Sequence, residues 1–220
     1  MMKSFWFISL LVLLVAGCVP VKPPHLVRDN SPATSPIGCC APLSPTRSHL
    51  FKATFDIKKH HLTGLLMIKR MDSLPVSAGP CERVYRIVFA NEIGMTFFDL
   101  ELKGDRCRVV SCFGPLNKKA LIKILGSDFS ILAGTRPLTD EKRYRQTSTM
   151  NRVISLKAGK SALWTTLSQP GDTCYATTGR SNMFDPVIIT WSSYSKGFPG
   201  KIILENPVIG MKMSLRLLER

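Results

Sequence analysis

The chain has 220 residues, and its 30 Lys and Arg against 15 Asp and Glu give a formal net charge of +15. Hydrophobic residues make up 45% of the chain and charged residues 20%, which is ordinary for a globular protein and excludes disorder throughout. The sequence has no internal repeat and no long apolar run, so collagen-like, coiled-coil and polytopic membrane proteins are excluded as well. This length predicts one globular domain, with room for a tail.

Residues 1–17 are typical of a secretory signal peptide, because Lys3 is followed by an uncharged apolar run over residues 5–15. The run is too short to cross a hydrocarbon core of about 30 Å as a helix, which disfavours a transmembrane anchor. It ends in Val15-Ala16-Gly17-Cys18, which resembles the bacterial lipobox, where the cysteine is diacylated and becomes the mature N-terminus. A cysteine that stands by chance at an ordinary cleavage site is the alternative interpretation.

The lipobox resemblance implies that lipid is attached to Cys18 and holds the protein on a bilayer, since several acyl chains give stable anchoring. Val19 stands where lipoproteins retained in the inner membrane typically carry Asp, so the resemblance implies the outer membrane of a Gram-negative bacterium, on its periplasmic face. Residues 18–48 hold seven of the fifteen prolines and few large apolar residues. We therefore expect this acylated segment to be a tether that builds no core.

From residue 49 onward, apolar and polar residues alternate as in half-buried strands. The alternation predicts strands over residues 51–57, 62–69, 84–89, 97–102 and 106–113, with a loop over 71–82 and a tight hairpin at Asn91-Glu92-Ile93-Gly94. A helical period then predicts a helix over 116–125 and a short second helix over 127–132, capped by Ser127 and ended by Gly134. Further strands are predicted near 150–156, 161–167, 173–178, 186–194, 201–205 and 211–217. We expect one mainly β domain over 49–220, an antiparallel sheet of about 11 strands curled around the helices.

The segment from Tyr85 to Leu100 also resembles a known family. It reads Tyr-Arg, an apolar strand, Asn-Glu-Ile-Gly and a second alternating strand, which is similar to the protruding hairpin of the LolB family of outer-membrane lipoprotein receptors. The strands at 201–204 and 211–217 resemble the last hairpin of that family. The resemblance implies the LolA/LolB fold, a strongly curved, incomplete antiparallel β-barrel with short helices over its open side. It further implies a monomer that accepts lipidated proteins from a LolA-like periplasmic carrier and helps to insert them into the outer membrane.

The resemblance places a membrane-insertion hairpin at Asn91, Glu92, Ile93 and Gly94. Ile93 occupies the position of the exposed leucine that helps the family transfer acyl chains into the membrane. Glu92 replaces the proline common there, and a charge at this place is costly to bury in a bilayer. In the alternative interpretation, Ile93 packs under a neighbouring loop.

The alternation also marks an inward apolar face, which suits acyl chains because they need dispersion and exclusion of water rather than specific polar geometry. The predicted cavity-lining residues on this face are Phe55, Leu66, Tyr85, Ile87, Phe89, Phe98, Leu100 and Met213. The same residues are equally typical of a closed and filled core. Only the family resemblance favours an open cavity.

Catalysis and metal binding are not indicated. The sequence has no CxxC, no Cys/His metal spacing, no G-x-S-x-G and no phosphate loop, and His60-His61 is typical of a solvated turn. We expect no enzyme activity, cofactor or metal. The six cysteines besides Cys18 allow up to three disulfides or isolated thiols, and Cys107 and Cys112 should not pair, because they face opposite sides of one strand. The other four are Cys39, Cys40, Cys81 and Cys174.

The basic residues are densest at Arg136, Lys142, Arg143, Arg145, Arg152, Lys157 and Lys160. Attraction to a membrane surface explains them better than nucleic-acid binding, which an exported lipoprotein rarely needs, and a plain solvated face fits equally well. Two alternative functions remain open. The domain could serve as a structural or protein-binding module of the envelope without lipid transfer, or carry another hydrophobic ligand such as a glycolipid.

Overall fold

The structure is a computed structural model that describes residues 26–29, 48–71, 82–136, 139–149, 151–158, 161–168, 175–181, 187–195 and 198–219. The predicted signal peptide, Cys18 and most of the predicted tether lie outside the described residues. So do most of the predicted loop over 71–82, four of the cysteines (Cys39, Cys40, Cys81 and Cys174) and Lys160.

The described residues form thirteen strands, one α-helix and one short 3-10 helix. The strands before the α-helix are β1 (Leu26–Arg28), β2 (His49–Ile57), β3 (His60–Arg70), β4 (Val84–Ala90), β5 (Thr96–Lys103) and β6 (Arg106–Cys112). The 3-10 helix η2 (Gly114–Leu116) and the α-helix α3 (Lys119–Leu132) follow. The strands after it are β7 (Thr139–Gln146), β8 (Arg152–Ala158), β9 (Ser161–Ser168), β10 (Tyr175–Ser181), β11 (Val187–Ser195), β12 (Phe198–Asn206) and β13 (Met211–Glu219).

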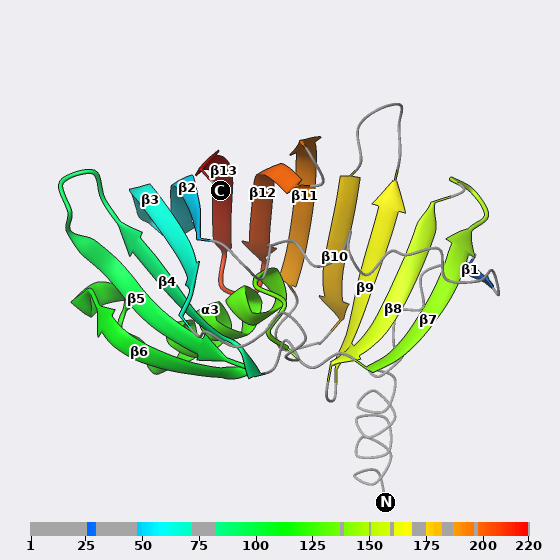
Figure 1. The fold of residues 1–220 in the computed structure, drawn as a ribbon, viewed down its shortest axis with the longest axis horizontal. Helices are drawn as coiled ribbons and strands as arrows, with labels where there is room; N and C mark the ends of the chain where they lie inside the picture. Colours follow the sequence, from blue (N-terminus) through cyan, green and yellow to red (C-terminus); the bar gives the residue numbers. More distant parts are fainter. Residues whose placement is uncertain are drawn as a thin grey trace, which may run out of the picture.

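The strands make one antiparallel sheet in the order β1-β7-β8-β9-β10-β11-β12-β13-β2-β3-β4-β5-β6. The sheet joins the two halves of the chain through β13, which pairs with β2 in register from Met211 opposite Ile57. It is not closed into a barrel, since β1 and β6 are the two ends of the strand order. The prediction of a mainly β, antiparallel domain is therefore confirmed. Figure 1 shows how strongly the sheet curves.

Two of these strands were not predicted. β7 has the sequence Thr-Asp-Glu-Lys-Arg-Tyr-Arg-Gln and no alternation of apolar residues, so nothing in its pattern marks a strand. Its charges are paired instead, with Arg143 bonded to Glu141 and Arg145 within 3.6 Å of Asp29. β1 pairs with β7 from Leu26 opposite Gln146. Residues 26–28 of the predicted tether are therefore part of the sheet.

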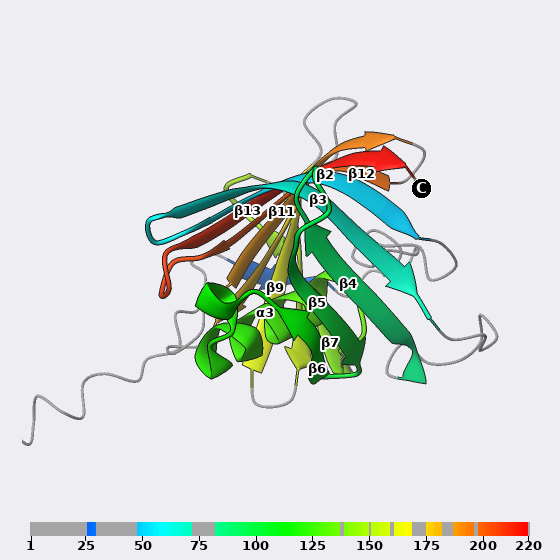
Figure 2. The same cartoon turned by 90° about the vertical axis from the view of Figure 1, so that its left-hand side faces the viewer.

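The prediction of two short helices is wrong, because α3 runs without a break from Lys119 to Leu132. Ser127 lies inside it and is not a cap, and its backbone carbonyl accepts a hydrogen bond from the Ser130 hydroxyl. Gly134 does follow the end of the helix, with a positive φ of 65° that suits a glycine at this position. Figures 1 and 2 show α3 on the concave side of the sheet, and it contacts β5 and β6.

The core lies between the concave face of the sheet and α3. β2 shows why the core lies on one face of the sheet, because its residues alternate strictly between buried and less buried positions along the strand. β4 and most of β13 show the same alternation, whereas β5 buries the four consecutive residues 97–100 and β6 has no fully buried residue. One continuous cluster of buried apolar side chains results, with members from β2–β5, β9, β11–β13, η2 and α3.

Candidate functional site: the β4–β5 hairpin and the concave core

The hairpin between β4 and β5 has a compact, hydrogen-bonded turn. The backbone N–H of Gly94 donates to the carbonyl of Asn91 at 3.1 Å, and the N–H of Asn91 donates to the carbonyl of Met95 at 3.0 Å. The Asn91 side chain accepts a further bond from the Met95 N–H at 2.7 Å. Gly94 has a φ of 87°, which a residue with a side chain rarely adopts. The turn is therefore ordered by its own sequence, as predicted for Asn and Gly at these positions.

The tip of this turn is apolar and open to solvent. Ile93 is 90% exposed, so the alternative in which it packs under a neighbouring loop is wrong. Glu92 and Gly94 are exposed beside it, and Asn91 is partly buried. Met95 is 44% exposed and adds a second apolar side chain, which the turn signals at Asn91 and Gly94 do not mark. The tip of the hairpin therefore presents two exposed apolar side chains, Ile93 and Met95.

The base of the hairpin is packed tightly against β3 and against aromatic rings. At Gly64 there is no room for a Cβ, because the carbonyl oxygen of Ala90 lies where it would stand. The ring of Phe97 lies 5.0 Å from that of Phe89 and 6.5 Å from that of Phe113, measured between centroids. The tip thus projects from a rigid base.

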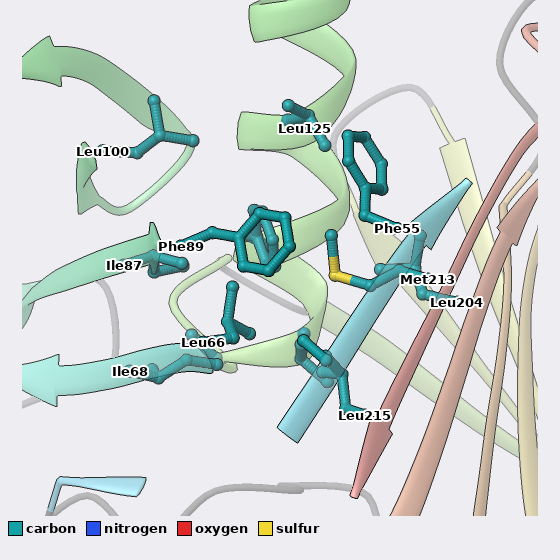
Figure 3. Packing of buried hydrophobic residues seen from close by; sticks show 14 of the residues in the cluster. Phe55, Leu66, Ile68, Ile87, Phe89, Leu100, Leu125, Leu204, Met213 and Leu215 are labelled. Atoms are coloured by element: carbon teal, nitrogen blue, oxygen red, sulfur yellow. The ribbon is translucent and has the colours of Figure 1, made fainter. Parts of the chain in front are cut away.

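The eight predicted cavity-lining residues all belong to the buried cluster, with exposed fractions between 0% and 3%. Phe98 is central, since its ring centroid lies 5.4 Å from that of Phe89 and 6.2 Å from that of Phe55. Figure 3 shows the side chains of Phe55, Phe89 and Met213 directed toward one another between the strands and α3. The structure therefore brings these residues together on one face, as predicted, and fills the space in front of them.

The filling comes from α3. Phe129 of the helix is fully buried, and its ring centroid lies 5.8 Å from that of Phe98. Leu125 also points into the cluster (Figure 3). Gly126 lies against Cys107 of β6 so closely that a Cβ there would overlap the cysteine side chain. The alternation of the strands could not reveal this helix contact, because an alternating strand looks the same facing a cavity or a helix.

The two described cysteines are free thiols, Cys107 and Cys112. Burial raises the pKa of the Cys107 thiol to about 11 and also raises the pKa of Cys112. Both are therefore poor nucleophiles at neutral pH. His60 and His61 are exposed, but they begin strand β3 and do not form the predicted turn, and His61 contacts Asp56. Within the described ranges, no group of His, Cys, Asp and Glu could hold a metal ion.

The basic residues of β7 and β8 lie on neighbouring strands, with Arg145 opposite Arg152. Arg143 and Arg145 are committed to Glu141 and Asp29, while Arg152 and Lys157 are exposed. In the part of the chain that the structure describes, no helix is long and apolar enough to cross a membrane. No protein-family model matches the chain, and no curated protein matches it either.

Proposed function

We propose that this chain is an outer-membrane-anchored lipoprotein of the LolB type. It receives lipidated proteins from a LolA-like carrier at the periplasmic face and helps to insert their acyl chains into the membrane. The proposal includes the finer fold assignment, an incomplete β-barrel whose open side is covered by α3. The observation that carries it is Ile93, 90% exposed at the tip of an ordered hairpin with a tightly packed base.

Ile93 is suited to a brief contact with the bilayer rather than to anchoring. Burying one such side chain contributes about 1.5–3 kcal/mol, which is too little for permanent attachment. Met95 beside it increases the apolar area, and Glu92 limits how deeply the tip can enter. Permanent attachment is assigned to the acyl chains on Cys18, so the hairpin is free to approach and leave the membrane.

Acyl chains can reach the predicted cavity-lining residues only if α3 moves, since they are covered in this structure. The inner face of α3 would lose its contacts with Phe98 as the helix moves away from the sheet. An acyl chain would then occupy the space that Leu125 and Phe129 fill in this structure. No external energy source is required. The direction of transfer follows from the relative affinities of the carrier, this chain and the bilayer.

The test measures transfer of a labelled lipoprotein from its carrier to liposomes, with the chain carrying Cys18→Ser so that it is unacylated. Ile93→Glu should leave folding intact and impair insertion. The matched control is Val208→Glu, because Val208 is also exposed, at 57%, and lies in the turn between β12 and β13. Unchanged insertion by Ile93→Glu would reject the hairpin mechanism. Failure of the folded wild-type chain to accept cargo from its matched carrier would reject the receptor function.

The second candidate function is a structural or protein-binding module of the envelope, and the filled core favours it. Amide hydrogen exchange distinguishes the two. If α3 withdraws to admit cargo, its amides should exchange through a local opening, much faster than those of β4 and β5. If the domain is a module with a permanent core, the amides of α3, β4 and β5 should all exchange only through global unfolding, and they should therefore be protected equally.

A further inference from the structure

An apolar groove lies at one end of the sheet, apart from the hairpin. Its volume is about 160 Å³, and it is formed by the turn between β2 and β3, the turn between β12 and β13, η2 and the first two turns of α3. Leu116, Leu121 and Ile57 are buried and supply apolar wall. Ile124 and Ile209 are partly buried and complete the apolar part of the lining.

The walls of the groove are held in place by backbone bonds. The N–H of Lys58 donates to the carbonyl of Gly210 at 3.4 Å, which ties the two turns together. The N–H of Lys118 donates to the carbonyl of Leu116 at 2.8 Å, which ties η2 to the start of α3. Lys58 has a φ of 53°, a left-handed conformation that is unfavourable for lysine. The two-residue turn between β2 and β3 imposes this conformation, and it places Lys58 on the rim of the groove.

The rim is positively charged. Lys58, His60 and Lys118 line the groove, and no acidic residue does. Among the described residues, neither Lys58 nor Lys118 has an acidic partner within ion-pair distance. The start of α3 reinforces this field, since its first turn has no acidic residue and no side-chain cap.

We propose that this groove binds a single-chain anionic amphiphile, a fatty-acid-like carboxylate, with its alkyl chain against the apolar walls and its head group at Lys58 and Lys118. Charge complementarity selects the head group. The groove is smaller than the pockets of about 300–1,000 Å³ that usually hold drug-sized ligands, so it favours a single alkyl chain, part of which lies outside the groove. The site goes beyond the proposed function, since a lipoprotein brings several acyl chains and none of the eight concave-face residues lines the groove.

The experiment titrates the chain carrying Cys18→Ser with three probes of equal chain length, below their micelle concentrations, by calorimetry. The probes are dodecanoate, dodecyltrimethylammonium and uncharged dodecanol. We expect dodecanoate to bind at least tenfold more tightly than dodecyltrimethylammonium, with dodecanol between them. Added salt should weaken dodecanoate binding more than dodecanol binding.

Three variants locate the site. Lys58→Met with Lys118→Met should reduce dodecanoate affinity about tenfold and remove the preference between head groups. Ala120→Trp, at an exposed position lining the groove, should fill it and abolish binding of all three probes. Lys123→Met is the control, because Lys123 is exposed on the same helix but does not line the groove. Equal affinity for the cationic and anionic probes would overturn the proposal, as would no binding of dodecanoate or binding unaffected by the two-lysine variant.

Discussion

Gly126 of α3 lies directly against Cys107 of β6, with no space for a Cβ between them. The contact joins the middle of the helix to the last strand before it in the chain, and α3 packs against β5 as well. In the proposed mechanism α3 has to leave the sheet, so the strength of this contact bears on stability and on that proposal.

Gly126→Ala should destabilise the protein by about 1–3 kcal/mol, although alanine normally favours a helix over glycine by about 1 kcal/mol. The overlap with the Cys107 side chain outweighs the propensity gain, because both the helix and the strand would have to shift. Urea unfolding measures the change. Lys123→Ala on the exposed side of the same helix should be neutral within about 0.5 kcal/mol. A Gly126→Ala variant more stable than wild type would show that α3 is not pressed against β6.

The sequence predicts a separate short helix over residues 127–132, because Ser127 is a typical N-cap. The structure instead continues α3 through Gly126 and Ser127. The glycine is present for a tertiary reason, the approach to Cys107, which no local pattern reveals. The strands with one buried face were predictable, as β2 and β13 illustrate, because burial imposes the alternation. β7 was not predictable, because Arg143 and Arg145 are stabilised by acidic partners rather than by apolar packing.

The hairpin was predicted in position and in tip residue, since Asn91 and Gly94 are local turn signals. What occupies the concave face was not predictable. Phe55 and Met213 alternate with polar neighbours in the same way whether they face a helix or an open cavity. The coverage by α3 depends on contacts between residues far apart in the chain.

Arg86→Met should destabilise the protein, because it leaves the largely buried Asp99 carboxyl group without its arginine partner. Arg86 donates two hydrogen bonds to this carboxylate, at 2.8 and 2.6 Å, between β4 and β5. Arg108→Met is the matched control, since Arg108 also makes two bonds to a carboxylate, that of Glu101, but on a more exposed surface. We expect Arg108→Met to lower the stability less than Arg86→Met does, because solvent screens the more exposed pair. Equal effects in thermal unfolding would contradict the role of burial.

The Cys107 thiol should remain protonated and unreactive at neutral pH. Burial raises its pKa to about 11 from an ordinary value of 9.0, so folding favours the neutral thiol. The resulting stabilisation is present below about pH 9 and is lost as the pH rises toward 11. Iodoacetamide labelling followed by peptide mass spectrometry should show little reaction at pH 8 and a steep rise above pH 10. Cys107→Ala should have a flatter dependence of stability on pH over that interval, and an identical dependence would contradict the assignment.

Gly64→Ala tests whether the base of the hairpin positions its tip. The added Cβ would collide with the Ala90 carbonyl, and we expect a loss of about 1–3 kcal/mol together with a displaced β4–β5 turn. Thr63→Ala is the control, because Thr63 is exposed on the same strand. Stability is read from urea unfolding, turn position from amide chemical shifts of residues 91–95, and function from lipoprotein transfer. In the proposed mechanism, Ile93→Glu blocks insertion with stability unchanged, whereas Gly64→Ala impairs insertion while the apolar tip is still present. Wild-type transfer by a Gly64→Ala variant with a displaced turn would show that an exposed apolar side chain suffices and that the packed base contributes only to stability.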